Sequence, residues 1–229
     1  MARVTLVSTS VRVAAIAAAV ISGTALLPSA PAQADAGPNI EVIFARGTHD
    51  DPGMGRVGSV LVDALQPLVG NRTVTGYAVE YPASYDFLTA QDGATDAQNR
   101  IATMAQQCPS TKIVLGGYSQ GAAVVDMLAG VPPLGDRIGD VGSAPPLPPE
   151  LANRVAAAAV FGNPSAKFSH PLDSIGLFSN RSVDLCLWGD PICSRGRNPF
   201  AHSRYESSEY IGQAAQFIAD PHSLKRVRE

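Results

Sequence analysis

The sequence lacks an excess of basic side chains, since its 229 residues include 17 Lys and Arg against 20 Asp and Glu, a net charge of −3. A nucleic-acid-binding domain normally carries a basic excess, so nucleic acid is excluded as a partner. Beyond residue 34 no run approaches the roughly 18 consecutive apolar residues of a membrane-spanning helix, so no membrane span is expected. The three cysteines have no histidine or second cysteine pair at metal-ligand spacing, so no metal is expected either.

The two ends of the chain differ in composition from its middle. Residues 1–34 contain two arginines and an almost wholly apolar stretch, and they end in Ala32-Gln33-Ala34, the small-x-small pattern of a signal-peptidase site. We expect cleavage after Ala34 and a secreted protein, with the cell wall as one extracellular location and cysteines that can oxidise. Two prolines disfavour the alternative, a retained membrane anchor. Residues 35–229 are long enough for one domain, with residues 221–229 as a flexible tail.

Apolar segments of two kinds alternate along this domain. Short apolar or alternating segments predict strands, and longer segments with apolar residues at every third or fourth position predict helices. The alternation implies parallel crossovers and therefore an α/β fold of three layers, with a central, mostly parallel sheet of about five strands and helices on both faces. The expected strands are residues 40–44, 73–79, 112–115, 155–161 and 182–187, and the expected helices are residues 57–68, 95–107, 120–129 and 206–219.

A G-x-S-x-G motif, Gly117-Tyr118-Ser119-Gln120-Gly121, lies between an expected strand and an expected helix. This strand-turn-helix setting is the one that a nucleophile elbow requires, and the glycines permit the sharp turn. The alternative is an ordinary glycine-rich turn with a serine that caps the helix. We interpret Ser119 as a nucleophile at the carboxyl edge of the sheet. The backbone N–H of Gln120 would then be one donor to an oxyanion.

A serine nucleophile needs a base, and the base needs an acid that orients it. Hydrolases with this elbow have the order Ser, acid, His along the chain. His202, between the fifth strand and the last helix, is the predicted base. Two acids compete: Asp184 lies within the fifth strand, where a surface carboxylate is the simpler interpretation, and Asp190 follows that strand. Asp190 lies between Cys186 and Cys193, which are predicted to form a disulfide that holds this loop in one geometry.

Four segments together resemble the cutinase family, in particular its secreted actinobacterial members. They are Phe44-Ala45-Arg46-Gly47-Thr48, the motif at 117–121, Phe161-Gly162-Asn163-Pro164 and Cys186-x3-Asp190-x2-Cys193 with His202. The resemblance spans nearly all of residues 35–229. It implies an α/β-hydrolase-like fold with an exposed serine and no large lid. It also implies hydrolysis of carboxylic esters, from short soluble esters to lipid or polyester, with no cofactor.

The resemblance also assigns roles to individual residues. Ser119, Asp190 and His202 would form the catalytic triad. Thr48 and Gln120 would form the oxyanion hole. One alternative keeps this machinery but uses another acyl donor, such as a thioester or a phospholipid. A second alternative is a catalytically silent surface protein on the same scaffold.

Aromatic residues in the loops after the second and fifth strands predict an acyl-binding surface. These loops should flank the nucleophile at the carboxyl edge of the sheet. They carry Tyr81, Phe87 and Phe200, which are apolar enough to hold an acyl chain or, alternatively, to cover the edge of the sheet. The six prolines between residues 132 and 149 predict a rigid spacer at the opposite edge.

The chain departs from the cutinase pattern in its cysteines. Members of that family commonly carry four, and the additional pair ties the segment before the first strand to the segment before the nucleophile strand. Cys108 is one half of that pair, and Gly37 stands at the position of the other half. We therefore expect Cys108 to remain a reduced thiol in a monomer, or to cross-link two chains if its sulfur is exposed.

Overall fold

A computed structural model describes residues 37–132 and 142–220, together with Met1. The predicted signal peptide after Met1, the tail at 221–229 and the middle of the proline-rich segment lie outside the described residues. The fold below is that of the unit Asp35–Glu229.

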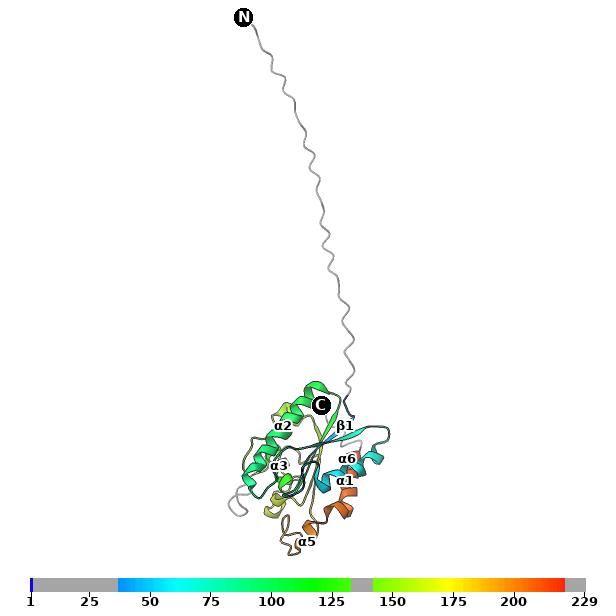
Figure 1. Ribbon diagram of the computed structural model, residues 1–229, viewed down its shortest axis with the longest axis vertical. Helices are drawn as coiled ribbons and strands as arrows, with labels where there is room; N and C mark the ends of the chain where they lie inside the picture. Colours follow the sequence, from blue (N-terminus) through cyan, green and yellow to red (C-terminus); the bar gives the residue numbers. More distant parts are fainter. Residues whose placement is uncertain (2–36, 133–141, 221–229) are drawn as a thin grey trace. The chain divides into compact units, whose positions relative to one another are not determined.

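Five strands form one sheet in the order β2-β1-β3-β4-β5, and all four pairings of neighbours are parallel (Figure 1). The predicted α/β fold is therefore confirmed. Every residue of β4 is buried although four of its seven residues are alanine, a residue that is usually depleted in strands. Small side chains suit this strand because layers pack on both of its faces. The strands are β1 (Ile40–Ala45), β2 (Val74–Ala78), β3 (Lys112–Tyr118), β4 (Val155–Phe161) and β5 (Ser182–Leu185).

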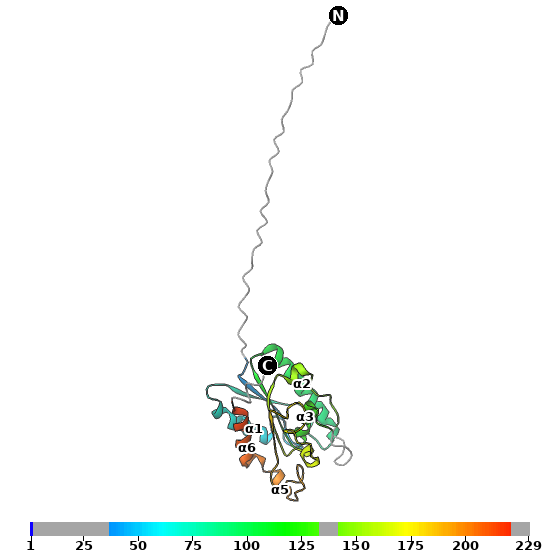
Figure 2. The same cartoon turned by 180° about the vertical axis from the view of Figure 1, so that it is seen from behind.

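Two pairs of helices cover the two faces of the sheet (Figures 1 and 2). The helices α2 (Ala90–Gln107) and α3 (Gln120–Ala129) lie on one face, and α1 (Gly55–Leu65) and α6 (Glu209–Ala219) lie on the other. Side chains that alternate along each strand fill two separate cores. In β1, for example, Ile43 belongs to the core under α2 and α3, whereas Phe44 belongs to the core under α1 and α6.

The helix α2 begins five residues before its predicted start. The prediction missed these residues because the first turns of the helix carry no apolar periodicity. Small residues serve there instead. A Cβ at Gly93 would lie 3.1 Å from both Tyr81 and Val124, so the close approach of this helix depends on the absence of a side chain. The remaining elements are short: η1 (Gln66–Val69), η2 (Phe87–Thr89), α4 (Pro149–Ala152), η3 (Pro164–Phe168), α5 (Pro199–His202) and η4 (Tyr205–Ser207).

The described part of the proline-rich segment differs from its prediction. Leu147 donates a backbone hydrogen bond to Leu128 near the end of α3, as a spacer at the amino edge would. Ser143, however, donates its backbone N–H to Gln91 in the first turn of α2. Because α2 begins at the carboxyl edge of the sheet, this segment reaches the edge where ligands bind and is not confined to the opposite edge. In the described ranges no helix is both long and apolar enough to cross a membrane.

Candidate active site

The turn that carries Ser119 joins β3 to α3 and has a strained backbone. Ser119 adopts a φ of 56°, a conformation that residues other than glycine rarely occupy. A Cβ at Gly117 would lie 2.2 Å from the carbonyl oxygen of Gly121, and a Cβ at Gly121 would lie 1.9 Å from that of Ala45. Both flanking positions of the motif therefore require glycine, and the turn exposes the serine hydroxyl at the carboxyl edge.

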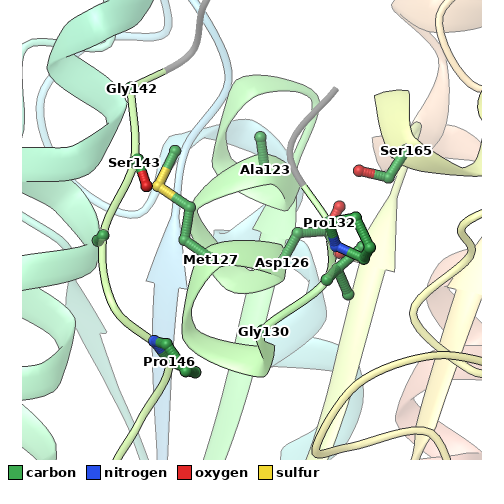
Figure 3. A pocket seen from close by; sticks show the side chains of 11 residues that line it. Ala123, Asp126, Met127, Gly130, Pro132, Gly142, Ser143, Pro146 and Ser165 are labelled. Carbon is green, nitrogen blue, oxygen red and sulfur yellow. The ribbon is translucent and has the colours of Figure 1, made fainter. Parts of the chain in front are cut away.

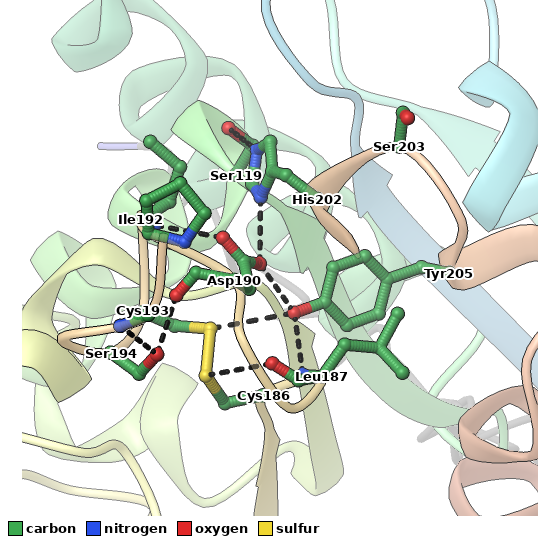
Figure 4. Close-up of polar contacts among 12 residues, drawn as sticks. Ser119, Cys186, Leu187, Asp190, Ile192, Cys193, Ser194, His202, Ser203 and Tyr205 are labelled. Atoms are coloured by element: carbon green, nitrogen blue, oxygen red, sulfur yellow. Dashed lines mark hydrogen bonds and ion pairs between the residues drawn. A yellow bond between two sulfur atoms is a disulfide. The ribbon is translucent and has the colours of Figure 1, made fainter. Parts of the chain in front are cut away.

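Ser119, His202 and Asp190 form one line of polar contacts (Figure 4). The Oγ atom of Ser119 lies 2.8 Å from Nε2 of His202. The Nδ1 atom of the same ring lies 2.8 Å from Oδ2 of Asp190. The three side chains come from the end of β3, from α5 and from the loop after β5. This is the arrangement of a nucleophile, a base and an orienting acid.

Asp190 is fully buried and nonetheless suited to carry a negative charge. Its Oδ2 accepts a hydrogen bond of 2.7 Å from the Tyr205 hydroxyl, and its Oδ1 accepts one of 2.8 Å from the Ile192 N–H. Burial alone would raise the pKa of Asp190, but the hydrogen bonds from His202, Tyr205 and Ile192 outweigh burial and lower that pKa below its ordinary value. The carboxylate is thus charged next to the imidazole ring.

The position of the His202 ring is set by aromatic and backbone contacts. The ring stacks on Tyr118 with centroids 5.1 Å apart, and the Tyr118 hydroxyl donates a hydrogen bond to the His202 carbonyl oxygen. On another side the ring lies against Gly162, where a Cβ would be 2.9 Å from Cε1 of the ring. At the start of α5, Asn198 accepts a hydrogen bond from the Phe200 N–H and caps this short helix.

A disulfide closes the loop that carries Asp190, which confirms the predicted bond between Cys186 and Cys193. Asp190 also donates its own N–H to the Leu187 carbonyl oxygen within this loop. Cross-linking eight residues could stabilise the folded state by roughly 2–3 kcal/mol through loop entropy, less any strain. The third cysteine, Cys108, is half-buried and lies outside this disulfide.

The loop after β1 brings Thr48 next to the nucleophile turn. The Thr48 hydroxyl donates a 3.1 Å hydrogen bond to the side-chain oxygen of Gln120. Gln120 is the first residue of α3, where a backbone N–H has no partner within its helix. Buried Arg46 holds the same loop by donating hydrogen bonds to backbone carbonyls, among them those of Asp50 and Tyr81. The predicted oxyanion residues therefore face one another beside Ser119.

A cavity of about 340 Å³ opens at Ser119. Of the three aromatic residues predicted for the acyl-binding surface, Phe87 lines this cavity, and the other two do not. Tyr81 is buried and donates its hydroxyl to the Arg46 carbonyl oxygen, so it supports the loop of Thr48 instead. Phe200 is 68% exposed to solvent outside the cavity. The cavity lining includes Thr48, Tyr85, Phe87, Tyr118, Gln120, Pro164, Ile192 and His202.

Asp184 is not the surface carboxylate that its place in β5 predicted, because the Leu172 segment and Asn163 cover it. Its Oδ2 accepts hydrogen bonds from the Leu172 N–H at 2.9 Å and from Asn163 Nδ2 at 2.7 Å. Asn163 also donates to Asp126 on α3 at 3.2 Å. Asp126 faces a second cavity of about 260 Å³, whose lining includes Ser165 (Figure 3).

Burial raises the pKa of both carboxyl groups that share Asn163, and it raises that of Asp126 further. Burial raises the pKa of Asp126 to about 8, the nearby Asp184 adds to this rise, and hydrogen bonds from Ser165 and Asn163 oppose it. Burial raises the pKa of Asp184 to about 6, against the hydrogen bonds from Leu172 and Asn163. Asp126 therefore holds its proton to higher pH than Asp184 does, in keeping with the shorter hydrogen bond from Asn163 to Asp184.

Sequence reasoning assigned no role to three residues that hold the site together. Arg46 and Asn163 belong to segments of the cutinase resemblance, so a signal for them was present. Tyr205 had no signal, because an aromatic residue before an amphipathic helix resembles an ordinary core residue. Among residues 37–132 and 142–220 no three His, Cys, Asp or Glu side chains lie together as a metal site would require.

Comparisons with known proteins agree with this geometry. The sequence profile of the family named Cutinase matches residues 36–221. Phospholipase Culp4 of Mycobacterium tuberculosis is 44% identical over 207 residues, which cover 89% of this chain and 88% of the relative. Carboxylesterase Culp1 of Mycobacterium bovis is 42% identical over 218 residues, which cover 90% of this chain and 94% of the relative.

Solved structures are similar as well. A Trichoderma reesei cutinase bound to a phosphonate inhibitor superposes with a TM-score of 0.64 at 31% identity, covering 85% of this chain and 79% of that one. The catalytic core of acetyl xylan esterase from Trichoderma reesei superposes with a TM-score of 0.64 at 28% identity, covering 79% of this chain and 97% of that one.

Proposed function

Because this chain belongs to the cutinase family and is a carboxylic ester hydrolase, we propose that Ser119, His202 and Asp190 are its catalytic triad and that it works through an acyl-enzyme. One observation carries the proposal: the two contacts of 2.8 Å that join Oγ, the imidazole ring and the buried carboxylate. The strained turn at Ser119 and the cavity at its hydroxyl support it.

In the first half of the reaction, Nε2 of His202 accepts the hydroxyl proton while Oγ of Ser119 attacks the ester carbonyl carbon. The carbonyl oxygen becomes an oxyanion, which the backbone N–H of Gln120 and a donor of Thr48 stabilise. The carbon–oxygen bond to the alcohol then breaks, and the alcohol leaves with the proton held by His202. The acyl group remains bonded to Ser119.

In the second half, a water molecule gives a proton to His202 and attacks the acyl carbon. The second tetrahedral intermediate collapses, the carboxylic acid leaves, and Oγ of Ser119 regains a proton from His202. Asp190 stabilises the imidazolium in both halves, because its lowered pKa keeps it charged beside the ring. The short hydrogen bonds from Tyr205 and Ile192 hold it in place without moving protons.

The lining of the cavity at Ser119 favours an ester with an apolar acyl group. Phe87, Ile192 and Pro164 present carbon to the cavity, while Thr48 and Gln120 lie at its polar end. One relative carries the name phospholipase and another the name carboxylesterase. Lipid esters are therefore proposed as the substrate class, alongside soluble esters of short acids.

Secretion is proposed on two grounds. Residues 1–34 have the composition of a signal peptide, and the Cys186–Cys193 disulfide suits an oxidising compartment. Amino-terminal sequencing of protein recovered from the culture medium should begin at Asp35. Recovery of an intact chain in the membrane fraction would instead support a retained anchor.

A fluorophosphonate probe tests the catalytic proposal because it bonds covalently to an activated serine. The wild type should be labelled and should hydrolyse an activated short-chain ester, while Ser119→Ala should do neither. Ser59→Ala is a matched control, since Ser59 is exposed on α1 and does not line the cavity at Ser119, so this variant should behave as the wild type. An unlabelled wild type, or equal labelling of Ser119→Ala, would favour the silent surface protein.

A further inference from the structure

The loop closed by the Cys186–Cys193 disulfide has two differently built sides. On the inner side, Asp190 faces His202, and Ile192 lines the cavity at Ser119. On the outer side lies a separate cavity of about 570 Å³ that takes no part in the proposed chemistry. Its lining is Cys186, Leu187, Trp188, Gly189, Ser194, Arg195, Gly196, Arg197 and Asn198.

The outer side combines exposed apolar area with unneutralised positive charge. Trp188 is 91% exposed, more than any other large apolar side chain in residues 37–132 and 142–220. Arg195 and Arg197 are exposed, and in that part of the chain neither forms an ion pair with a carboxylate. Between Asp190 and Glu206 the sequence has three arginines and no acidic residue, although the whole chain has a net charge of −3.

A close backbone contact and several hydrogen bonds hold the backbone that carries Trp188, Arg195 and Arg197, so the exposure of these side chains follows from the fold. A Cβ at Gly196 would lie 2.1 Å from the backbone of Gly189, so the backbone at Gly196 packs directly against the backbone at Gly189. The Asn198 N–H donates a 2.8 Å hydrogen bond to the Gly189 carbonyl oxygen. The Ser194 hydroxyl donates to the Asp190 carbonyl oxygen and accepts from the Gly196 N–H.

We propose that this outer side, defined by Trp188, Arg195 and Arg197, is a docking surface for an anionic phospholipid bilayer. Guanidinium groups bind phosphodiester oxygens in a two-pronged geometry, and an indole ring partitions into the region between head groups and acyl chains. An exposed tryptophan beside two arginines matches both chemical layers of such a surface. A soluble anion would need the arginines but not the exposed indole.

Docking on this loop has a consequence for catalysis, which rests on the proposed function. Because the same loop supplies Ile192 to the cavity at Ser119, a bilayer bound to its outer side lies next to the entrance for an ester. The net negative charge of the chain opposes approach to an anionic bilayer by other faces. The arginine pair therefore selects the orientation in which the candidate active site meets the lipid.

The chain offers a direct readout, because Trp188 is its single tryptophan. In full-length protein carrying Ser119→Ala, which cannot consume lipid, phosphatidylglycerol vesicles should shift the tryptophan emission to shorter wavelength. Phosphatidylcholine vesicles should not, and added salt should reverse the shift. Emission from Trp188 reports only on this surface, so binding through residues 1–34 or the basic tail does not produce the signal.

Charge variants test which side chains are responsible. Arg195→Gln with Arg197→Gln should weaken the vesicle titration on the order of thirtyfold, since each arginine near an anionic surface contributes about 1 kcal/mol. Replacing both by lysine should retain most of the binding. Arg72→Gln with Arg154→Gln makes the same change in net charge at the amino ends of β2 and β4 and should bind as the parent does.

Activity assays keep this proposal separate from the proposed function. With Ser119 intact, the double glutamine variant should hydrolyse a soluble short-chain ester at the wild-type rate and an ester embedded in phosphatidylglycerol vesicles more slowly. If the wild type does not hydrolyse the soluble ester, the proposed function is contradicted, and the emission titration remains an independent test of docking.

Several results would overturn the docking proposal. An emission shift of equal size with phosphatidylcholine would show that charge plays no part. Unchanged binding by the double glutamine variant, or no shift of Trp188 with phosphatidylglycerol, would show that this surface does not contact the bilayer. A shift caused by soluble glycerol phosphate or by dextran sulfate, but not by vesicles, would assign the surface to a soluble anion or to a polysaccharide.

Discussion

The Tyr205 hydroxyl donates a hydrogen bond of 2.7 Å to Oδ2 of Asp190, the oxygen that also faces the imidazole ring of His202. Tyr205 is fully buried, and its oxygen in turn accepts the Leu187 N–H at 2.9 Å. One side chain thus joins the candidate acid to the disulfide-closed loop and to the core under α6. Tyr205 is a positioning residue in this arrangement, because it touches no reacting atom.

Tyr205→Phe should lower kcat about tenfold with little change in KM, since one charge-assisted hydrogen bond to the acid is lost. It should also cost roughly 1–3 kcal/mol of stability, because the partly buried Leu187 N–H loses its partner. The diagnostic readout is the acidic limb of the pH–activity profile. This limb should move to higher pH, because an Asp190 carboxylate that loses the hydrogen bond from Tyr205 is more basic and makes the His202–Asp190 pair hold its proton more tightly. The control is Tyr210→Phe on α6, and an unmoved limb would reduce Tyr205 to a packing residue.

The two candidate acids can be distinguished by matched substitutions. Asp190→Asn should preserve the fold and lower turnover by about four orders of magnitude, because the imidazole loses the partner that orients it and stabilises its charged form. Asp184→Asn should remain within tenfold of the wild type, since Asp184 contacts Asn163 and Leu172 rather than the histidine. Turnover on an activated ester and far-ultraviolet circular dichroism of both variants provide the test. The reverse order of effects would move the acid to Asp184.

Substitutions of Phe87 and of Phe200 are expected to differ in their effect on acyl-chain preference. Phe87 lines the cavity at Ser119, so Phe87→Ala should change the dependence of kcat/KM on acyl length. Phe200 lies outside the cavity, so Phe200→Ala should leave that dependence as in the wild type. Rates on a series of activated esters from two to sixteen carbons, on the order of eight compounds, measure both profiles. Identical profiles for Phe87→Ala and wild type would remove Phe87 from the acyl-binding surface.

The buried carboxyl pair predicts how stability depends on pH. The pKa of Asp126 is about 8 in the folded protein against an ordinary 3.8. Between these values the unfolded chain releases this proton while the folded chain keeps it, so the stability that Asp126 contributes below pH 4 declines as pH rises toward 8. The pKa of Asp184, about 6, adds a decline between pH 4 and 6.

Asp126→Asn should therefore flatten the fall of Tm between pH 4 and pH 8. Asparagine is uncharged throughout this range and can still accept the hydrogen bond from Asn163. Asp63→Asn, at an exposed position of α1, is the control and should retain the wild-type slope. Thermal unfolding at four or so pH values is sufficient, and a slope equal to that of the wild type would show that Asp126 is charged in the folded protein.

Gly37 lies against Cys108, which gives the departure from the cutinase pattern a structural test. A Cβ at residue 37 would be 2.7 Å from Cβ of Cys108, about 1 Å closer than the roughly 3.8 Å usual in a disulfide. A small outward shift of the segment before β1 would therefore allow Gly37→Cys to close a second disulfide. The loop-entropy model predicts a gain of up to roughly 4 kcal/mol. Thiol titration under denaturing conditions should find one thiol in the wild type and none in the variant.

Two outcomes would contradict this prediction. Two thiols in the variant, with an unchanged Tm, would show that residue 37 does not approach Cys108 closely enough. A dimer band of the wild type on a non-reducing gel would show that Cys108 cross-links two chains. A monomeric variant with a raised Tm agrees with the prediction.

Local patterns in the sequence determined the sheet and the nucleophile. The predicted bounds of β4 at 155–161 and of α3 at 120–129 match the structure, because the apolar run of each element and the glycine that ends α3 at Gly130 are local features of the sequence. The G-x-S-x-G motif fixed the turn at Ser119 in the same way, since close backbone contacts demand its glycines wherever the rest of the chain lies. The disulfide joins cysteines only seven positions apart, and its prediction also needed no distant contact.

Only the tertiary structure decided which distant groups meet at the serine. Ser119 and His202 are separated by 83 positions, and Arg46 reaches the Tyr81 carbonyl oxygen across 35. No periodicity in the sequence records whether Asp184 or Asp190 faces the histidine, or that Tyr81 supports a loop while Phe87 lines the cavity. These outcomes depend on how the loops at the carboxyl edge pack on one another. Such packing is a property of the assembled sheet, because residues far apart in sequence become neighbours only when parallel strands align their ends.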